Sequence, residues 1–381
     1  MGCVLCLRAY VSTCLPVYLY PCLPPSLYNH AMPKICIVPR VEGLAGMASF
    51  RLKFEAGLKA RGYEVTHHPD LADSAILVIA GTRGLLSLWR AKRRGVRIVQ
   101  RLDGINWVHR KRNTGWRHFI RAEYGNLMLR LIRRFLADRI IYQSQFSRTW
   151  WEDWYGKTKS PSFIVHNGVD LNFYSPGGVR DTIPHHRLLV VEGNLGGGYE
   201  AGLDSAVRLA ELLNEEHNLP TQLVVVGKIH DAHRVRVESK ARVPIEWLGV
   251  VPRERIPEID RSAHLLFSAD VNAACPNSVI EALACGLPVA AFDTGALNEL
   301  VIGDSGRLAP YGSDVWKLEQ PVIAPLADSA AEILRDNPRF RRAARAHAES
   351  ALGLEKMVDS YLKVLLEDSE NSENRVFQHP A

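Results

Sequence analysis

The sequence predicts an α/β protein with two doubly wound parallel sheets, one in each half of the chain. Short apolar runs alternate with amphipathic stretches, which is the pattern of parallel strands joined by helices. A length of 381 residues is long for one core and sufficient for two domains. The segment Ser175-Pro-Gly-Gly178 separates two alternating series, so we place the domain boundary there.

The first half begins with a strand at Lys34–Val38, a glycine-containing loop and a helix over about Ala48–Arg61. Phe50, Phe54 and Leu58 recur every four residues, as on the buried face of an amphipathic helix. Further strands are predicted at Ala75–Ala80, Val96–Arg101, Arg139–Gln143 and Phe163–His166.

The second half repeats this pattern. We predict strands at Arg187–Glu192, Gln222–Gly227, Ile245–Leu248, Leu265–Ser268 and Val289–Phe292, and helices at Ala201–His217 and Ser278–Cys285. Residues 33–174 and 175–366 are therefore expected to form two Rossmann-like domains that face each other across a cleft, with a disordered tail over 367–381.

The first 32 residues differ from the rest of the chain. No charged residue occurs between Ala9 and Pro33, but four prolines interrupt the stretch, so it cannot cross a bilayer as one continuous helix. A secretory signal is the alternative, although Arg8 is its only basic residue and a clean cleavage site is missing. We predict an extension outside the fold, with the true start at Met32.

The composition is that of an ordinary globular protein, with 47% hydrophobic and 23% charged residues. Seven cysteines are present, four of them in the first 22 residues, and the others have no partner at metal-ligand spacing. This favours a reduced, cytoplasmic protein over a disulfide framework or a zinc site.

Positive charge is concentrated in residues 90–148, where 16 Lys and Arg face three acids, although the whole chain carries only +6. Aromatic and aliphatic residues are interleaved with these cations, which suits a helix on an anionic membrane surface. A solvated helix face is the simpler alternative. Nucleic-acid binding is less favoured, because no recognised nucleic-acid motif accompanies the charge.

The most informative stretch runs from Asn272 to Val289 and reads as a loop, a helix opening near Asn277 and Ser278, and a turn into a buried strand. A helix N-terminus offers unpaired N–H groups to a phosphate. Glu281, placed in the first turn, could accept hydrogen bonds from a ribose diol. The alternative is that Asn277 or Ser278 caps the helix and Glu281 completes the cap.

This stretch resembles the donor-binding signature of the family 4 glycosyltransferases, which have two Rossmann-like domains in the glycosyltransferase-B arrangement. Four other segments are similar to the family in the expected order, so the resemblance covers about residues 33–365. They are Gly43-Leu-Ala-Gly46, Arg61-Gly-Tyr-Glu-Val65, Asn167-Gly-Val-Asp170 with Phe173 and Pro176, and Asp293-Thr-Gly-Ala-Leu-Asn-Glu-Leu-Val301.

The resemblance implies roles for individual residues. Glu281 would bind the ribose of a nucleotide-sugar donor, and Glu299 stands at the usual acidic place of the next loop. The donor's diphosphate would lie between the backbone of Asn277, Ser278 and Val279 and the loop that carries Gly43 and Gly46.

The chain also departs from the family pattern. Ala273 replaces a glutamate that contacts the transferred sugar, for which Asp270 or Asn272 could substitute. Asn194 and Tyr199 stand where a diphosphate-binding Arg and Lys are common, so charge-assisted bonds are lost. Lys228 or backbone N–H groups of the glycines at 196–198 could replace these cations, although a plain turn explains both segments equally well.

In the first half, a histidine common at the end of the fourth strand is absent. The chain has Gln100-Arg-Leu-Asp-Gly-Ile-Asn106 at this point, so Asp103 becomes a catalytic candidate beside Glu281, with Asn106 nearby. Asp103 followed by Gly104 is also a common turn signal.

The resemblance thus implies a hexosyltransferase-like enzyme that retains the anomeric configuration and uses no metal or tightly bound cofactor, with a nucleotide-sugar as co-substrate. The acceptor would be a saccharide or a lipid-linked sugar. The alternative is a protein of this fold that binds a nucleotide or glycan without turnover, as the departures at Ala273, Asn194 and Tyr199 suggest. A third, less favoured reading is a binder of anionic polymers.

Overall fold

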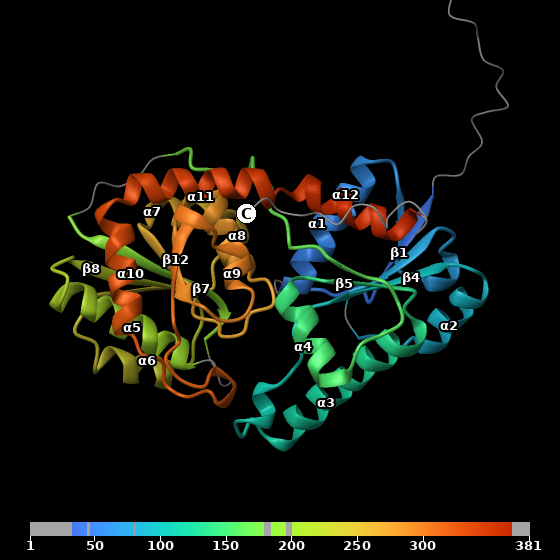
Figure 1. Ribbon diagram of the computed structural model, residues 1–381, viewed down its shortest axis with the longest axis horizontal. Coiled ribbons are helices and arrows are strands. Elements are labelled where there is room, and N and C mark those ends of the chain that lie inside the picture. The colour runs from blue at the N-terminus through green and yellow to red at the C-terminus, as the bar shows by residue number, and fades with distance from the viewer. Residues whose placement is uncertain (1–32, 44–45, 80, 179–183, 196–199, 368–381) are drawn as a thin grey trace, which may run out of the picture. The chain divides into compact units, whose positions relative to one another are not determined.

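The structure, a computed structural model, describes residues 33–43, 46–79, 81–178, 184–195 and 200–367. The chain from Pro33 onward forms one compact unit. It contains two six-stranded sheets in which all strand pairs are parallel, with helices packed around them (Figure 1). The predicted fold class is confirmed. The expected extension over residues 1–32 and the tail from residue 368 lie outside the described residues.

The first sheet has the strand order β2-β1-β3-β4-β5-β6. Its strands are β1 (Lys34–Val38), β2 (Glu64–Thr66), β3 (Ala75–Val78), β4 (Arg97–Leu102), β5 (Arg139–Tyr142) and β6 (Ser162–Ile164). Its helices are α1 (Gly46–Ala60), α2 (Leu85–Arg93), α3 (Trp116–Leu131) and α4 (Gln145–Tyr155).

The second sheet has the order β12-β11-β10-β7-β8-β9. Its strands are β7 (His186–Asn194), β8 (Thr221–Lys228), β9 (Ile245–Gly249), β10 (Leu265–Phe267), β11 (Val289–Phe292) and β12 (Gly306–Ala309). Its helices are α5 (Glu200–Glu215), α6 (Asp231–Glu238), α7 (Ile256–Ser262), α8 (Asn277–Ala284), α9 (Leu297–Leu300), α10 (Ala324–Arg335) and α11 (Asn337–Ala351).

All ten strands predicted from the apolar runs are present; β1 and β11 match at both ends, and the bounds of the others differ by at most two residues. Two strands were not predicted, β2 and β12, and both lie at the edge of a sheet. β2 has three residues and β12 begins with a glycine, so neither contains the run of apolar residues from which the other strands were recognised.

The last helix, α12 (Leu354–Leu366), differs from our assignment of residues 175–366 to the second domain. It packs against α1, and Tyr361 contacts the rings of Phe50 and Phe54 with centroids 5.2 Å apart. A Cβ on Gly57 would lie 2.6 Å from a methyl group of Val358, so glycine permits this close approach. The apolar face of a helix does not indicate which sheet it packs against. We assigned α12 to the second domain because it follows that domain in the sequence, whereas it packs on the first.

The candidate residues lie at the carboxyl ends of the parallel strands, where ligands bind in open α/β sheets. Asp103 follows β4, Asn194 ends β7 and Lys228 ends β8. Asp270 follows β10, and Asp293 comes directly after β11.

Candidate functional site

Helix α8 begins at Asn277, so Asn277, Ser278 and Val279 are its first three residues. Their backbone N–H groups have no partner within the helix, and this end also carries the positive end of the helix dipole. The preceding residue is Pro276, and no side chain caps the helix. The alternative that Asn277 or Ser278 is a cap is therefore wrong. This end of α8 is suited to bind an anion such as a phosphate.

Glu281 is the fifth residue of α8, one turn further along than the sequence analysis placed it. Its Oε1 accepts a hydrogen bond from Lys53 Nζ at 3.2 Å, and the two side chains are 13% and 6% exposed. Burial lowers the pKa of Lys53; the charge of Glu281 opposes this, but the net pKa stays lowered. Glu281 thus belongs to a buried ion pair with α1 and not to a cap.

Sequence reasoning missed Lys53, although a signal for it exists. Lys53 lies three residues after Phe50 and one before Phe54, so a lysine occupies the apolar face of α1. A buried lysine requires a partner that bonds to its ammonium group. A carboxylate elsewhere in the chain, such as Glu281, could therefore have been expected to pair with it.

A second cation lies near Glu281. Arg253 Nε donates to Tyr174 Oη at 3.3 Å, and the buried Tyr174 ring has Lys53 Nζ 6.0 Å from its centroid. Burial raises the pKa of Tyr174, and Glu281 raises it further. Lys53 and Arg253 therefore bring positive charge to α8 from positions other than those of the missing family Arg and Lys.

The glycine loop of the first half lies against the start of α8. Gly46 opens α1, and a Cβ on it would lie 3.6 Å from Asn277 Nδ2. Gly43 has φ of +112°, which favours glycine. Arg51 Nε donates to the carbonyl of Val41 at 2.9 Å and holds the start of this loop. Residues 44–45 are outside the described part of the chain.

Asn167 fixes the loop that leads into α8. Its Nδ2 donates to the carbonyl of Cys275 at 3.0 Å and to Gln143 Oε1 at 3.1 Å. Its Oδ1 accepts from Arg101 Nη2 at 2.9 Å, and all of these groups are buried. The segment that resembled the family's interdomain stretch thus carries the buried residue that positions the signature loop.

The ends of β7 and β8 lie side by side, because Asn194 and Lys228 are paired in register. The Leu195 N–H donates to the Lys228 carbonyl at 2.9 Å, and the Lys228 side chain is exposed. Tyr199 and the glycines at 196–198 lie outside the described residues, so their expected roles stay predictions.

Two carboxyl groups come together at the ends of β7 and β10. Burial raises the pKa of Glu192, and the nearby Asp270 raises it further. Burial likewise raises the pKa of Asp270. These side chains resist ionisation, which reduces the repulsion that two carboxylates would exert on a bound phosphate.

Ala273, at the place of the missing glutamate, is buried, and its carbonyl accepts from the Ala296 N–H at 2.9 Å. The preceding residue, Asn272, has φ of +57° and is 5% exposed. Among the described residues its Nδ2 has no hydrogen-bond partner. A buried donor without a partner is costly, and a bound hydroxyl group would satisfy it.

Glu299 contacts the N-terminus of α4 in the first half. Its two carboxylate oxygens accept hydrogen bonds from the backbone N–H groups of Gln145 at 2.7 Å and Phe146 at 2.8 Å. His166 Nε2 lies 3.1 Å from Oε2. Burial raises the pKa of Glu299, but the bonds from His166, Phe146 and Gln145 outweigh it and the net pKa is lowered. In this structure Glu299 joins the two halves.

Asp103 is half-buried just beyond β4, and its carbonyl accepts a hydrogen bond from Trp151 Nε1 at 2.7 Å. Burial raises its pKa, and the charge of Arg101 opposes this rise. Asn106 bonds to Asn126 of α3 through both its backbone N–H and its side-chain amide, each at 3.1 Å. Asp103 therefore has the environment of a carboxyl group that can hold a proton, whereas Asn106 supports the local fold.

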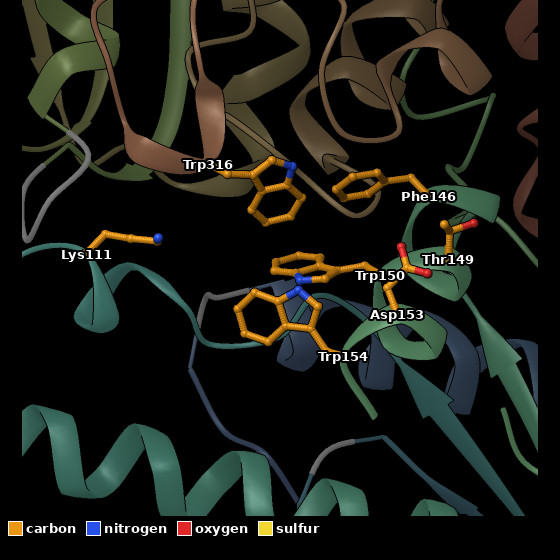
Figure 2. A pocket seen from close by; sticks show the side chains of 7 residues that line it. All are labelled: Lys111, Phe146, Thr149, Trp150, Asp153, Trp154 and Trp316. Atoms are coloured by element: carbon orange, nitrogen blue, oxygen red, sulfur yellow. The ribbon is translucent and has the colours of Figure 1, made fainter. Parts of the chain in front are cut away.

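A pocket of about 430 Å³ lies where α4 meets the turn η7 (Val315–Lys317) of the second half (Figure 2). Sequence reasoning did not find it. Its walls are mostly aromatic, and Figure 2 shows Trp316 facing Trp150 and Trp154. The lining residues are Lys111, Phe146, Thr149, Trp150, Asp153, Trp154 and Trp316.

The basic residues of the window 90–148 divide into two sets. Several are used inside the fold: Arg101 bonds to Asn167, Arg133 Nε donates to Tyr142 Oη at 3.0 Å, and Arg139 Nη1 donates to the Val364 carbonyl at 2.7 Å. Others, such as Arg117 and Arg121 on α3, are exposed. The charge excess is thus only partly a surface property.

Within the described ranges, no helix is both long and apolar enough to cross a membrane. The same ranges contain no group of three or more His, Cys, Asp or Glu side chains that could hold a metal ion.

Two family models match the sequence. One, described as Glycosyltransferase Family 4, matches residues 17–173, and the other, described as Glycosyl transferases group 1, matches residues 186–328. The first match begins at residue 17, inside the segment 1–32. That this segment is an extension outside the fold therefore stays a prediction. No curated protein matches the chain significantly.

Solved structures share the fold at low identity. Sucrose-phosphate synthase from Thermosynechococcus elongatus has a TM-score of 0.66 and 16% identity, over 88% of this chain and 98% of its own. Anabaena HepE in complex with UDP-glucose has a TM-score of 0.59 and 15% identity, over 87% and 100%. WaaG, a glycosyltransferase involved in lipopolysaccharide biosynthesis, has a TM-score of 0.61 and 14% identity, over 88% and 100%.

These structures show the two-domain glycosyltransferase-B fold, and the two family models lie on the two halves that the sheets define. The start of the signature helix α8 lies beside Gly46, and Asn167 of the interdomain segment bonds to the loop before it. The chain belongs to the family 4 glycosyltransferases, and it is a glycosyltransferase enzyme.

Proposed function

We propose that the protein transfers a sugar from a nucleotide-sugar donor to a saccharide or lipid-linked acceptor, with retention of the anomeric configuration. One observation carries the proposal: the open N-terminus of α8 lies against the Gly43–Gly46 loop, with the Gly46 Cβ position 3.6 Å from Asn277 Nδ2. Backbone N–H groups at this point suit a diphosphate. The complex of HepE with UDP-glucose supports this class of donor.

In this proposal the bond between the anomeric carbon and the diphosphate oxygen breaks, and the oxygen leaves with the electron pair. A bond forms from the acceptor oxygen to the same carbon, and the hydroxyl proton is released. Asp103 is our candidate to hold this proton, because burial raises its pKa. Positioning of the donor and stabilisation of the departing phosphate supply the rate enhancement.

The proposal assigns each part of the donor to residues around the start of α8. The ribose is assigned to Glu281, which Lys53 orients. The diphosphate is assigned to residues 277–279 and the glycine loop, with Lys53, Arg253 and the exposed Lys228 supplying positive charge that Asn194 does not. Asn272, whose buried Nδ2 has no partner within the described residues, takes the place of the glutamate lost at Ala273.

The competing function is binding of a nucleotide or glycan without turnover. A thermal-shift screen over nucleotides and nucleotide-sugars identifies the donor, because a ligand that binds the folded state raises its melting temperature. Incubation with the selected donor then separates the two functions, since a glycosyltransferase slowly transfers the sugar to water. A stabilising donor that is never hydrolysed, with or without acceptors, would establish the binding function instead.

We further propose that the enzyme is cytoplasmic and attaches to an anionic membrane surface through α3. Trp116 is 70% exposed and Ile120 is 59% exposed, and both lie on α3 beside the exposed Arg117 and Arg121. The exposed apolar side chains of α3 recur at spacings of three and four residues: Trp116, Phe119, Ile120, Tyr124 and Leu127. An apolar stripe flanked by arginines is the pattern of a helix lying in a bilayer interface.

Vesicle binding tests the membrane proposal. Each cation near an anionic surface contributes about 1 kcal/mol, so reversing Arg117, Arg121 and Lys111 to Glu should release the protein from anionic vesicles. Raised salt should do the same, while nucleotide binding should survive. If the wild-type protein does not bind anionic vesicles at low salt but binds RNA or DNA with strong salt dependence, the basic surface around α3 binds nucleic acid instead.

A further inference from the structure

The aromatic pocket between α4 and η7 combines residues from both halves of the chain. Trp316 lies 5.1 Å from Trp150 and 6.4 Å from Trp154 between ring centroids, and Phe146 stacks on Trp316 at 6.2 Å and 20°. Trp154 is 36% exposed, so its ring is partly open to solvent beside the buried Trp150. A hollow of about 430 Å³ is large enough for a small ligand.

Polar groups flank these rings. In Figure 2 the Lys111 ammonium lies on one side of the indoles, and Thr149 and Asp153 lie on the other, on α4. Within the described residues, neither Lys111 nor Asp153 has a hydrogen-bond or ion-pair partner for its side chain. The pocket thus pairs apolar faces with an ammonium and a carboxylate that are available to a ligand.

A third observation concerns Trp150, which is one of the residues that line the pocket. Trp150 is only 4% exposed, and its indole N–H has no hydrogen-bond partner among the described residues. A buried donor left without an acceptor costs free energy. A hydrocarbon ligand would leave it unpaired, whereas a ligand with hydroxyl oxygens would accept from it.

The pocket adjoins the assigned donor side. The Phe146 side chain lines it, while the Phe146 N–H donates to Oε1 of Glu299 at 2.8 Å, in the short helix α9 that follows β11. A ligand in the pocket would therefore lie next to the segment whose Glu299 the family resemblance assigns to donor binding.

We propose that this pocket binds the saccharide of the acceptor, with a sugar ring against the indoles of Trp154 and Trp316. The C–H face of a pyranose is apolar and packs on aromatic rings, while its hydroxyls bond to Lys111, Asp153 and the Trp150 N–H. This inference rests on the proposed function, because it names the acceptor subsite of the same transfer reaction.

Ligand-observed saturation-transfer NMR tests the assignment with methyl glycosides of glucose, galactose, mannose and N-acetylglucosamine. At least one should bind the wild-type protein, and Trp154→Ala or Trp316→Ala should weaken that binding about tenfold. Trp154→Phe, which keeps an aromatic face, should retain most of it. Trp89→Ala is the matched control, because Trp89 is 46% exposed on α2 and does not line the pocket.

Two readouts separate this inference from the proposed function. Stabilisation by nucleotide-sugar and its slow hydrolysis should be unchanged in Trp154→Ala, while transfer to a saccharide acceptor should show a raised KM. Wild-type protein that neither binds nor hydrolyses any nucleotide-sugar contradicts the proposed function. Normal donor hydrolysis with glycoside binding absent, or equal in all variants, overturns the inference alone. Binding of octanol without any glycoside, or displacement of glycosides by UDP, also overturns it.

Discussion

Two of the contacts between the two halves of the enzyme differ in their chemistry. The signature contact consists of the polar bonds that Lys53 and Asn167 make with Glu281 and Cys275 beside α8. The aromatic contact consists of the rings of Phe146, Trp150 and Trp154 against Trp316, together with Trp107 5.1 Å from Trp316.

The two contacts differ in how far the two halves can shift before the contact is lost. Buried hydrogen bonds weaken steeply with distance and angle, so the signature contact specifies one arrangement. Aromatic pairs are favourable in several geometries, and here both stacked and edge-on pairs occur around Trp316. We infer that the donor side is held in one geometry, whereas the acceptor side can adjust to its ligand.

The largest expected effect comes from breaking the ion pair of the signature contact. Glu281→Gln or Lys53→Met leaves a buried partner alone and should lower the free energy of unfolding by about 3–5 kcal/mol. The double variant should lose less than the sum. Nucleotide affinity should fall 10- to 100-fold in Glu281→Gln, as expected for a lost charge-assisted bond of about 1.5–3 kcal/mol.

Urea unfolding with and without nucleotide measures both quantities. Glu55→Gln is the control, because Glu55 forms a similarly buried pair with Arg51 within α1, at 2.7 Å. It should destabilise the fold but change nucleotide affinity far less than Glu281→Gln does, because Arg51 keeps its bond to the Val41 carbonyl. Equal losses of affinity in Glu55→Gln and Glu281→Gln would show that Glu281 has no direct contact with the ribose.

Removing Asn167 should loosen the signature contact by a smaller amount. Asn167→Ala leaves the Cys275 carbonyl and Arg101 without a bond, at a cost of about 1–3 kcal/mol for each buried group left unsatisfied. Nucleotide binding should weaken because the loop before α8 is less fixed. The comparably buried Asn126→Ala should cost similar stability and leave nucleotide binding intact. If both variants bind nucleotide alike, Asn167 does not position the loop.

Glu299 makes a further contact between the two halves, and its pH dependence extends the comparison. Its carboxylate stabilises the N-terminus of α4, so Glu299→Gln should cost about 1 kcal/mol at pH 7. The pKa of Glu299 is lowered in the folded protein, so its carboxylate stabilises the fold above the ordinary carboxyl pKa. This stabilisation is lost as the pH falls through the pKa of the folded protein. Thermal melts from pH 7 to pH 3 should therefore fall more steeply for the wild type than for Glu299→Gln.

An effect of the opposite sign is expected at the carboxyl pair of Glu192 and Asp270. Their folded pKa values are raised, so this contribution is greatest below the ordinary carboxyl pKa of about 4 and is lost as the pH rises. Asp270→Asn should flatten the decline of melting temperature between pH 5 and pH 8. A decline as steep as that of the wild type would mean that the pair ionises as freely in the folded protein as in the unfolded chain.

The features that could be predicted from the sequence are those formed by neighbouring residues of the chain. The strands were recognised as apolar runs, and the α8 segment as a loop followed by a helix, so Asn277, Ser278 and Glu281 could be named from one stretch of chain. Lys53 lies 228 residues from Glu281, and no local pattern joins them. Trp316 is likewise distant from Trp150, so the aromatic pocket exists only once the two halves meet. The alternative that Asn277 or Ser278 caps the helix arose because both residues are good caps in isolation, but the structure has Pro276 at that position and no side-chain cap.

The return of α12 to the first sheet has a consequence for how the protein is made. Five residues of this helix belong to the core around β1 and α1: Met357, Val358, Tyr361, Val364 and Leu365. Arg61 Nε also donates to Asp359 Oδ1 at 2.9 Å across 298 residues of sequence. The domain that is synthesised first therefore cannot complete its core until nearly the whole chain has left the ribosome. Such late, long-range contacts form slowly, and until then the apolar face of α1 is exposed to chaperones.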